Sequence, residues 1–439
     1  MTRISNIGGG SSGSTPVASA LYTPATVVIA PVGYVHKADY YTDGINDNVE
    51  IEAALASLSS TGGKVLLRPG TYYMNGTVDV YSNTELCGEG QSTILFYQNG
   101  TVNSRILLRN ADQTNGNTGI FLHDFTINGN YPTELGTPTR NQVYLFHSTN
   151  CIVSNLNIIN APDSSIVLDG GSDNIVSHNF IDTTADIGIY VSGSNNNIIT
   201  ENNIQGSASY GIRLRNGSQS NTVSNNFLYN CGTTGQPSII VMESSEQNLI
   251  SSNYVSTSGL TGIDINNSAY TSVVGNYVEL SQREGIKIDT ISRGLITGNV
   301  THRNSQAAGN TYSGIVLNSA SNCVVSGNRS GDIGSGTRQK YGIEEGGTSD
   351  YNSITGNMLE RNGTGGLHVV GSHTEVGHNN VAISGSVSNS HSGFTALSQI
   401  DMNSNNIVNL LDPISAQDAA TRNYVDSVNF INTFTFMGA

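Results

Sequence analysis

Tryptophan is absent from this chain of 439 residues, and only 12% of its residues are charged. Hydrophobic residues make up 36%, too few for a helical bundle, and no apolar run reaches membrane-spanning length. The chain has 18 Lys and Arg residues against 33 Asp and Glu, a formal charge of −15, so it offers no extended basic surface to phosphates. We therefore expect neither a nucleic-acid partner nor membrane insertion.

The chain has only four cysteines, which lie far apart and form no CxxC pair, so they indicate neither a zinc site nor a disulfide framework. We expect buried free thiols at Cys87, Cys151, Cys231 and Cys323. The nine His residues also lack the spacing of a catalytic metal site. The run from Asp169 to Asp173, DGGSD, offers oxygen ligands for calcium but is also typical of a turn. No obligatory cofactor is predicted, and calcium is an option that the sequence does not require.

What the sequence does contain is a regular repeat of asparagine, which closes a short apolar segment such as NIVSHN or NIITEN every 22 to 29 residues. The repeated residues are Asn179, Asn202, Asn226, Asn253, Asn276, Asn299, Asn328, Asn357 and Asn379. Segments of about five residues are too short to close a core alone, so successive units must stack to bury their Ile and Val residues. The 50 glycines suit the many turns of such a solenoid. The repeat therefore predicts an all-β chain folded as a parallel β-helix.

Asparagine suits a corner of the coil for two reasons. It tolerates the left-handed backbone region, and its amide can bond to the equivalent Asn one coil away. We interpret the repeated asparagines as structural.

A short helix is predicted before the first coils, capped by Asp47 or Asn48 and ended by Gly62 and Gly63. Its apolar stripe is predicted to consist of Val49, Ala53, Leu55 and Leu58. A strand, KVLLRPGTYYM, follows at once. A helix at this point would cover the open end of a solenoid, where exposed strand edges invite aggregation.

Residues 38–95 contain DGINDNVEIEAAL followed by GGKVLLRPGTYYM and SNTELCGEG. This block resembles the opening of the pectate-lyase-like proteins, whose fold is a right-handed parallel β-helix. The resemblance implies that fold for this chain. It does not imply a reaction, because the superfamily includes lyases, hydrolases, epimerases and phage tailspikes.

The segment 398–428, LSQIDMNSNNIVNLLDPISAQDAATRNYVDSV, resembles a short module of phage tail fibres and tailspikes. It matches the pattern DMxxNxIxNLxDPxxxQDAAxxxYVD. The resemblance implies a homotrimer, other phage tail proteins as partners, and a place in the virion from which the protein acts at the host cell surface.

In a β-helix, equivalent positions of successive coils lie about 4.8 Å apart, so outward side chains form ladders. Counted from the Gly-Ile step of each repeat, one ladder is predicted to run through Tyr144, Val167, Tyr190, Arg213, Ile240, Asp264, Lys287, Val316, Glu344 and His368. A second ladder, two residues further along each strand, includes Arg215 and Asp289. Charged residues concentrate in the middle coils of this face, although they are scarce in the whole chain.

Asp264 and Asp289 are predicted to lie on adjacent coils, offset by two residues and about 8 Å apart. This separation suits an inverting glycosidase, in which one carboxyl group protonates the leaving oxygen and the other activates water. We predict that Asp264, Asp289 and Glu344 are catalytic. The substrate-binding residues are predicted to be Tyr190, Arg213, Arg215, Arg283 and Lys287. The alternative is a set of ordinary surface ion pairs, Asp264 with Lys287 and Asp289 with Arg283.

Two segments resemble matching coils of mannuronan C5-epimerases: TINGN at 126–130 and YGIEEGGTSDYNSITGN at 341–357. The DPHE catalytic motif of that family is absent, since the corresponding coil reads IVLDGG at 166–171. The loop 131–141, with His123, Asp124, Tyr144 and His147 expected nearby, forms a second candidate groove.

Together these patterns predict a phage tailspike or tail-fibre-like protein that binds a bacterial surface polysaccharide and depolymerises it as a glycosidase or lyase. One alternative is a non-enzymatic fibre or adhesin, which the lack of Trp favours because sugars often stack on aromatic rings. Another is a uronate lyase or C5-epimerase. The predicted organisation is a flexible linker at 1–16, a cap and first coils at 17–95, the β-helix at 96–390 and a tail-fibre-like segment at 391–439.

Overall fold

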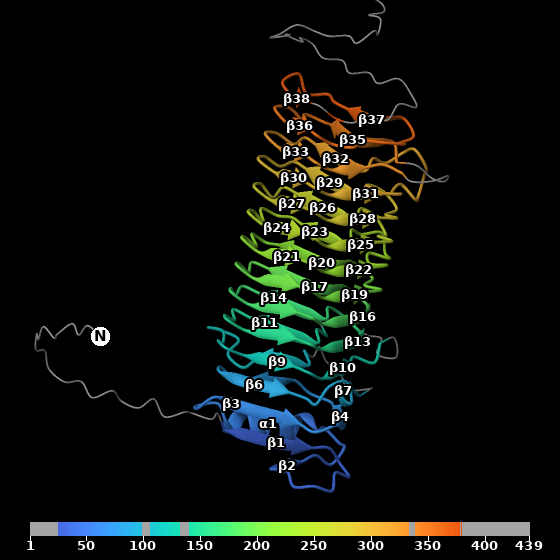
Figure 1. Cartoon of the computed structure of the whole chain (residues 1–439). Helices are drawn as coiled ribbons and strands as arrows, with labels where there is room; N and C mark the ends of the chain where they lie inside the picture. Colours follow the sequence, from blue (N-terminus) through green and yellow to red (C-terminus); the bar gives the residue numbers. More distant parts are fainter. Residues whose placement is uncertain (1–24, 99–105, 132–139, 333–338, 378, 380–439) are drawn as a thin grey trace, which may run out of the picture. The chain divides into compact units, whose positions relative to one another are not determined.

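The computed structural model describes residues 25–98, 106–131, 140–332, 339–377 and 379. In Figure 1 the strands stack coil upon coil, from β2 (Tyr40–Tyr41) at the blue end to β38 (Glu375–Val376) at the orange end. The strands form three parallel sheets, as expected for a right-handed parallel β-helix. The fold prediction is thus confirmed. The predicted linker 1–16 and the tail-fibre-like segment 391–439 lie outside the described residues.

Sheet A is the longest of the three sheets, with 15 described strands. In spatial order it consists of β2 (Tyr40–Tyr41), β1 (Thr26–Ala30), β3 (Gly63–Leu67), β6 (Thr84–Cys87), β9 (Phe121–His123), β12 (Ile152–Ser154), β15 (Ile175–Ser177), β18 (Ile198–Thr200), β21 (Thr222–Ser224), β24 (Leu249–Ser251), β27 (Ser272–Val274), β30 (Leu295–Thr297), β33 (Val324–Ser326), β36 (Ser353–Thr355) and β38.

Sheet B follows sheet A in each coil and has 11 described strands. They are β4 (Gly70–Met74), β7 (Thr93–Tyr97), β10 (Thr126–Asn128), β13 (Asn157–Ala161), β16 (Phe180–Thr184), β19 (Asn203–Gln205), β22 (Phe227–Tyr229), β25 (Tyr254–Ser256), β28 (Tyr277–Glu279), β31 (Val300–His302) and β34 (Arg329–Ser330).

Sheet C completes each coil and has 12 described strands. They are β5 (Val78–Val80), β8 (Leu108–Asn110), β11 (Val143–Phe146), β14 (Ile166–Asp169), β17 (Ile187–Ser192), β20 (Tyr210–Arg215), β23 (Ile239–Val241), β26 (Ile263–Asn266), β29 (Ile286–Asp289), β32 (Ile315–Asn318), β35 (Tyr341–Gly346) and β37 (Gly365–His368).

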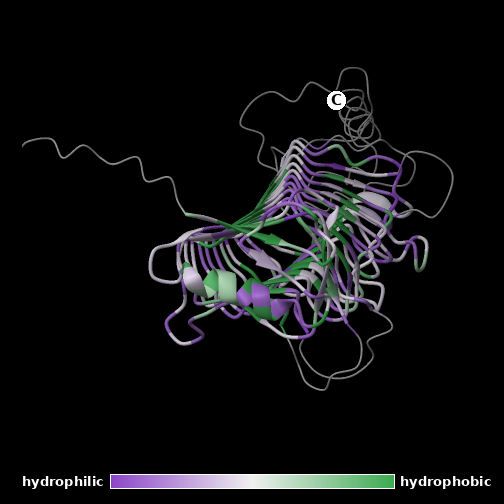
Figure 2. Ribbon diagram, turned by 90° about the horizontal axis from the view of Figure 1, so that it is seen from below, coloured by the Kyte–Doolittle hydropathy of each residue, from purple (hydrophilic) through white to green (hydrophobic). Residues whose placement is uncertain are grey.

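The core is a continuous column of aliphatic side chains that point inward from all three sheets. One coil contributes Ile199 from sheet A, Ile204 from sheet B and Ile212 from sheet C, and each is fully buried. Figure 2 shows hydrophobic residues along the strands, whereas hydrophilic residues are frequent in the turns. Each buried Ile stabilises the fold by about 1.5–3 kcal/mol, so the column compensates for the low overall hydrophobic content.

The repeated asparagines form a buried hydrogen-bonded row between sheets A and B, as predicted. The Nδ2 of Asn276 donates to the Oδ1 of Asn299 (3.0 Å) and to the carbonyl of Ile250 (2.8 Å). Its Oδ1 accepts from the Nδ2 (2.9 Å) and the backbone N–H (3.0 Å) of Asn253. The same pattern runs from Asn179 to Asn379, so each amide locks the register of its coil on the next.

The left-handed residue at this corner is not the asparagine itself, which corrects our expectation. The residue before it has positive φ instead, as at His178 (57°), Glu201 (56°) and Gly275 (65°). The asparagine must point its amide inward to bond with neighbouring coils, so the sharp change of direction falls on the preceding residue. In later coils this residue is Gly, which adopts positive φ without steric cost.

A second buried asparagine row, not anticipated from the sequence, lies between sheets C and A. It runs through Asn174, Asn197, Asn221 and Asn248, whose amides bond from coil to coil at 3.0, 2.9 and 3.2 Å. Two of the three corners of the middle coils are therefore fixed by side-chain amides.

The N-terminal end is covered by helix α1 (Asn48–Ser57) together with β1 and β2, as the capping prediction required. The predicted apolar stripe was partly wrong, because Val49 is 57% exposed and Ala53 is exposed as well. The buried face is instead Ile51, Ala54, Leu55 and Leu58. The single strand predicted over KVLLRPGTYYM is two strands, β3 and β4, since Pro69 cannot donate to a sheet and marks the corner.

All four cysteines are free and buried, which confirms the prediction from their spacing. In the described part of the chain, no helix combines the length and apolar character that a membrane crossing demands.

We predict that Asn276→Leu lowers the free energy of unfolding by at least about 3 kcal/mol, because two donors of Asn253 lose their acceptor inside the coil. Thermal unfolding of the variant measures this loss. The matched control is Asn203→Leu, an outward, half-buried position on sheet B, where we expect a change within about 0.5 kcal/mol. Equal melting temperatures for the two variants would contradict a structural role for the row.

Candidate functional site

The predicted outward ladder lies in direct register on sheet C. Each of its residues, from Tyr144 to His368, faces its neighbour in the next strand without a slip. The ladder also extends toward the N-terminus through Arg109 to Asp79. The repeat therefore aligns side chains that are hundreds of residues apart in sequence.

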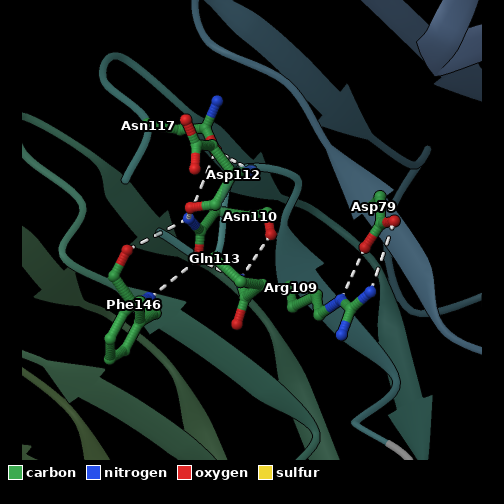
Figure 3. Close-up of polar contacts among 7 residues, drawn as sticks. All are labelled: Asp79, Arg109, Asn110, Asp112, Gln113, Asn117 and Phe146. Atoms are coloured by element: carbon green, nitrogen blue, oxygen red, sulfur yellow. Dashed lines mark hydrogen bonds and ion pairs between the residues drawn. The ribbon is translucent and has the colours of Figure 1, made fainter. Parts of the chain in front are cut away.

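The N-terminal end of this ladder is held by an ion pair. The Nε of Arg109 lies 2.6 Å from Oδ1 of Asp79 (Figure 3). Beside it, the inward Asn110 donates to the carbonyl of Phe146 (3.0 Å) and accepts from its N–H (2.7 Å), which ties β8 to β11. Arg109 is paired with Asp79 and the backbone around it is fixed, so the Arg109 side chain offers no free charge to a ligand.

Asp264, in the middle of the ladder, is a buried carboxyl group. It is only 8% exposed, and its Oδ1 is buried with no hydrogen-bond partner. Burial raises the pKa of Asp264 to about 6; the ammonium of Lys287 opposes this shift, whereas the charges of Asp289 and Glu284 add to it. A large fraction of Asp264 is thus protonated slightly below neutral pH.

Asp289, one coil further on, is a carboxylate held by three donors. Lys287 Nζ lies 2.5 Å from its Oδ2, and Asn318 Nδ2 (2.8 Å) and Thr290 Oγ1 (3.0 Å) donate to its Oδ1. Burial acts to raise the pKa of Asp289, but the hydrogen bonds from Lys287 and Asn318 outweigh it and leave the pKa lowered. Asp289 therefore stays ionised where Asp264 does not.

The ion pairs that the sequence suggested as the alternative were assigned to the wrong partners. Lys287 pairs with Asp289 on its own strand, not with Asp264 on the neighbouring one. The guanidinium of Arg283 lies over the Tyr312 ring, 5.3 Å from its centroid, instead of pairing with Asp289. A long Lys side chain can reach the next outward residue on its own strand. The prediction considered only contacts between neighbouring strands.

Asp264 and Asp289 have the predicted offset, since Asp264 faces Lys287 and Asn266 faces Asp289 across β26 and β29. Strand spacing and rise place them about 8 Å apart. Their pKa values move in opposite directions for distinct reasons, burial for one and hydrogen bonding for the other. Two carboxyl groups that differ in this way can act as an acid and a base.

Arg213, two coils before Asp264, is a cation without a carboxylate partner among the described residues. Its guanidinium carbon lies 4.8 Å from the ring centroid of Tyr210 and 5.7 Å from that of Tyr190. Its Nη2 lies 3.7 Å from the Met242 sulfur, and its buried Nε has no hydrogen-bond partner. Aromatic faces hold this cation in place and leave its charge available to an anion.

Two further predicted residues, Arg215 and Glu344, lie on the same face, but each already has a charged partner. Arg215 forms an ion pair with Glu243 at 3.1 Å. Glu344 accepts from Lys340 (2.8 Å) and from Ser313 (2.5 Å). Glu344 also lies two strands beyond Lys287, about 10 Å along the ladder, so it does not join the Asp264–Asp289 pair.

The second predicted groove, beside loop 131–141, is divided by the structure. His123 belongs to β9 of sheet A, whereas Tyr144 belongs to β11 of sheet C, where its hydroxyl donates to Asp169 Oδ2 (2.6 Å). Burial raises the pKa of Tyr144, and Asp169 adds to the shift. Most of the loop itself, 132–139, lies outside the described residues.

Two tyrosines of this region were missed by reasoning from the sequence. Tyr210 lies against the guanidinium of Arg213, and Tyr312 lies against that of Arg283. Tyr210 directly precedes a Gly-Ile step. An aromatic residue at that position could have indicated a contact with the Arg two residues after the Gly.

Comparison with protein families gives one match. The family model described as periplasmic copper-binding protein (NosD) matches residues 58–235 and, in a second alignment, residues 129–309. The two matches overlap and together span more than half of the chain. The second begins 71 residues after the first, about three coils, so the model fits the repeat in two registers. A search of curated protein sequences finds no match.

Solved structures similar to this chain are parallel β-helix proteins of low sequence identity. The A-module of mannuronan C-5 epimerase AlgE6 from Azotobacter vinelandii is 20% identical, with a TM-score of 0.59, over 77% of this chain and 96% of that one. The Dettilon tailspike protein is 15% identical, with a TM-score of 0.58, over 76% and 67%. Gene product 12 of bacteriophage phi29 is 16% identical, with a TM-score of 0.54, over 73% and 51%. These similarities support the fold.

We predict that Asp264→Asn stabilises the protein by up to about 3 kcal/mol at pH 8 and has little effect at pH 4. The pKa of Asp264 is higher in the folded state, about 6 against an ordinary 3.8, so the native protein loses stability as pH rises between these values. The variant has no charge to bury and escapes this loss. Thermal unfolding at both pH values measures the difference.

Asp289→Asn is the matched control for this measurement. Because the pKa of Asp289 is lowered by folding, its contribution to stability is present at pH 8 and disappears as pH falls through the folded-state pKa. We therefore expect Asp289→Asn to destabilise the protein at pH 8. A decrease in stability at pH 8 for Asp264→Asn as well would contradict the assigned state of Asp264.

Proposed function

We propose that this chain, which belongs to the NosD family, binds an acidic bacterial surface polysaccharide along the outward face of sheet C and hydrolyses it there. The observation that carries the proposal is the pair of carboxyl groups Asp264 and Asp289, which lie on adjacent strands with pKa values shifted in opposite directions. We further propose that the protein is a trimeric phage tail spike or fibre. The module-like sequence at 398–428 supports that role, and the fold shared with a tailspike protein is consistent with it.

The proposed reaction is inverting hydrolysis of a glycosidic bond. Asp264, protonated near pH 6, donates its proton to the leaving oxygen, and the ionised Asp289 removes a proton from the attacking water. The backbone positions of the two residues lie about 8 Å apart, a spacing compatible with the separation of about 6.5–9.5 Å between the carboxyl groups of inverting enzymes, which leaves room for that water. Lys287, bonded to Asp289, keeps the base ionised.

The neighbouring cations suit an acidic polymer. Arg213 and Arg283 both lie over tyrosine rings, and neither forms an ion pair with a carboxylate of the described residues. A sugar carboxylate would supply the missing partner. From β17 to β35 the predicted residues span seven strands, about 29 Å, so an extended chain of several sugars can lie along the ladder.

The copper in the family's description is not part of this proposal. Copper prefers thiolate, thioether and imidazole ligands, whereas the groups around Asp264 and Asp289 are carboxylates, a lysine and an asparagine. Within the described ranges, only Glu85, Cys87 and His123 form a group of three or more His, Cys, Asp or Glu residues close enough to share a metal. That group lies on sheet A, so the proposed chemistry on sheet C is assigned to Asp264 and Asp289 alone.

A second candidate function, binding without cleavage, is favoured by the burial of Asp264. Its Oδ1 is inaccessible, so a polymer bound on the surface reaches the acid only if neighbouring side chains move. A non-enzymatic adhesin would use Arg213, Arg283 and the tyrosines for recognition and retain Asp264 as a structural group.

We predict that Asp264→Asn and Asp289→Asn each reduce cleavage of an acidic polysaccharide by a factor of about 10² or more, while binding is retained. Released reducing ends and unsaturated uronate products are measured together. Reducing ends without unsaturated products support hydrolysis. Asp182→Asn on sheet B is the control and should leave the rate unchanged.

Other outcomes would overturn this assignment. Unsaturated products would indicate β-elimination and shift the chemistry to Tyr190, Arg213 and Lys287. Full activity in both Asp variants would place the site elsewhere. Binding with no cleavage by the unmodified protein would favour the adhesin.

We predict that Arg213→Gln weakens binding of an acidic polysaccharide about tenfold or more, because a desolvated charge-assisted contact is lost. Binding of a neutral polysaccharide should not change. Arg329→Gln, on sheet B, is the control for a general loss of positive charge. Titration of labelled polymers measures both affinities, and equal effects of the two variants would contradict a specific role for Arg213.

A further inference from the structure

Three potential metal ligands meet on sheet A, near the N-terminal end of the β-helix and on a different sheet from the proposed polysaccharide site. Cys87 at the end of β6 faces His123 at the end of β9, and Glu85 lies two residues before Cys87 on the same strand. The carboxylate of Glu85, the thiol of Cys87 and the imidazole of His123 have donor atoms that all lie within 4.8 Å of one another.

The imidazole of His123 is already oriented toward this cluster. Its Nδ1 lies 2.7 Å from Oδ2 of Asp124, and its Nε2 lies 3.0 Å from Oε1 of Glu85. The Phe121 ring stacks on it with centroids 4.0 Å apart. Histidine ligands of metals typically have a carboxylate on one ring nitrogen, as Asp124 is on Nδ1 here, while the other nitrogen faces the remaining ligands, as Nε2 faces Glu85.

A positive charge already occupies the cluster. Lys64, on the neighbouring strand β3, places its Nζ 2.7 Å from Oε1 of Glu85 and also interacts with Cys87. The three donors are thus arranged around a cation contributed by the protein. A metal ion bound by them would displace the Lys64 ammonium toward solvent, which its long side chain and intermediate exposure permit.

We propose that Glu85, Cys87 and His123 form a binding site for a divalent metal ion of the Zn²⁺ class, with Asp124 as the residue that positions His123. A thiolate, an imidazole and a carboxylate are the ligands that Zn²⁺ takes in proteins, and water completes a tetrahedron. Calcium and magnesium prefer oxygen ligands alone and do not fit a site with a thiolate and an imidazole. The bound ion would join the coils of β6 and β9.

The test uses the full chain, reduced and freed of metal with a chelator, and titrated with Co²⁺ and then Zn²⁺. We expect one Co²⁺ per chain, a thiolate-to-cobalt charge-transfer absorption in the near ultraviolet, and loss of that absorption when Zn²⁺ is added. Cys87→Ser should abolish the absorption, whereas Cys151→Ser, which removes another buried thiol, should leave it intact.

Affinity for Zn²⁺, measured by competition with a chromophoric chelator, tests the other residues. His123→Gln and Asp124→Asn should each weaken binding by about 10- to 100-fold. Lys64→Met removes the competing cation and should strengthen binding.

Three results would overturn the proposal. They are the absence of Co²⁺ and Zn²⁺ uptake by the unmodified chain, an unchanged absorption in Cys87→Ser, and an unchanged Zn²⁺ affinity in His123→Gln. The His123→Gln result decides the matter if Cys87→Ser fails to fold. None of these readouts depends on polysaccharide cleavage, so the metal site and the proposed function fail or succeed separately.

Discussion

The rest of the structure depends on the alignment of each coil with the next. Backbone bonds between parallel strands would tolerate a slip, but the buried amides of the two asparagine rows do not, since each side chain bonds to its equivalent one coil away. A slip by one residue would turn every inward Ile outward and leave these amides without partners. Buried side chains therefore fix the register of each coil on the next. The outward residues are aligned as a consequence.

This inherited alignment explains how a chain with few charges assembles a charged surface. Arg213, Asp264 and Lys287 come from different repeats and share a single row on sheet C because their coils are in register. The same rigidity lets the fold keep Asp264 buried and without a partner for Oδ1, an arrangement that a softer scaffold would relieve by local rearrangement. The stability that the rows and the aliphatic column provide is large compared with the cost of one such group.

The sequence repeat made the alignment of the coils predictable. It did not make the contacts between individual side chains predictable. Strand periodicity and the Gly-Ile step sufficed to place all ten residues of the first ladder, because backbone register follows from the repeat alone. The choice of Lys287 to bridge to Asp289 depends on side-chain rotamers and distances that periodicity does not contain. Cys87 and His123 were separately noted but not joined, since the insertion between their coils hides the register that brings them together.

In the proposed reaction Asp264 acts as a buried acid on a surface that binds polysaccharide. The most direct test is the pH dependence of kcat/KM for cleavage of an acidic polysaccharide by the unmodified protein. Because the acid must be protonated to act, we expect kcat/KM to fall as pH rises through about 6. A rate that stays constant or rises between pH 5 and 8 would contradict it, as would the absence of cleavage at pH 5.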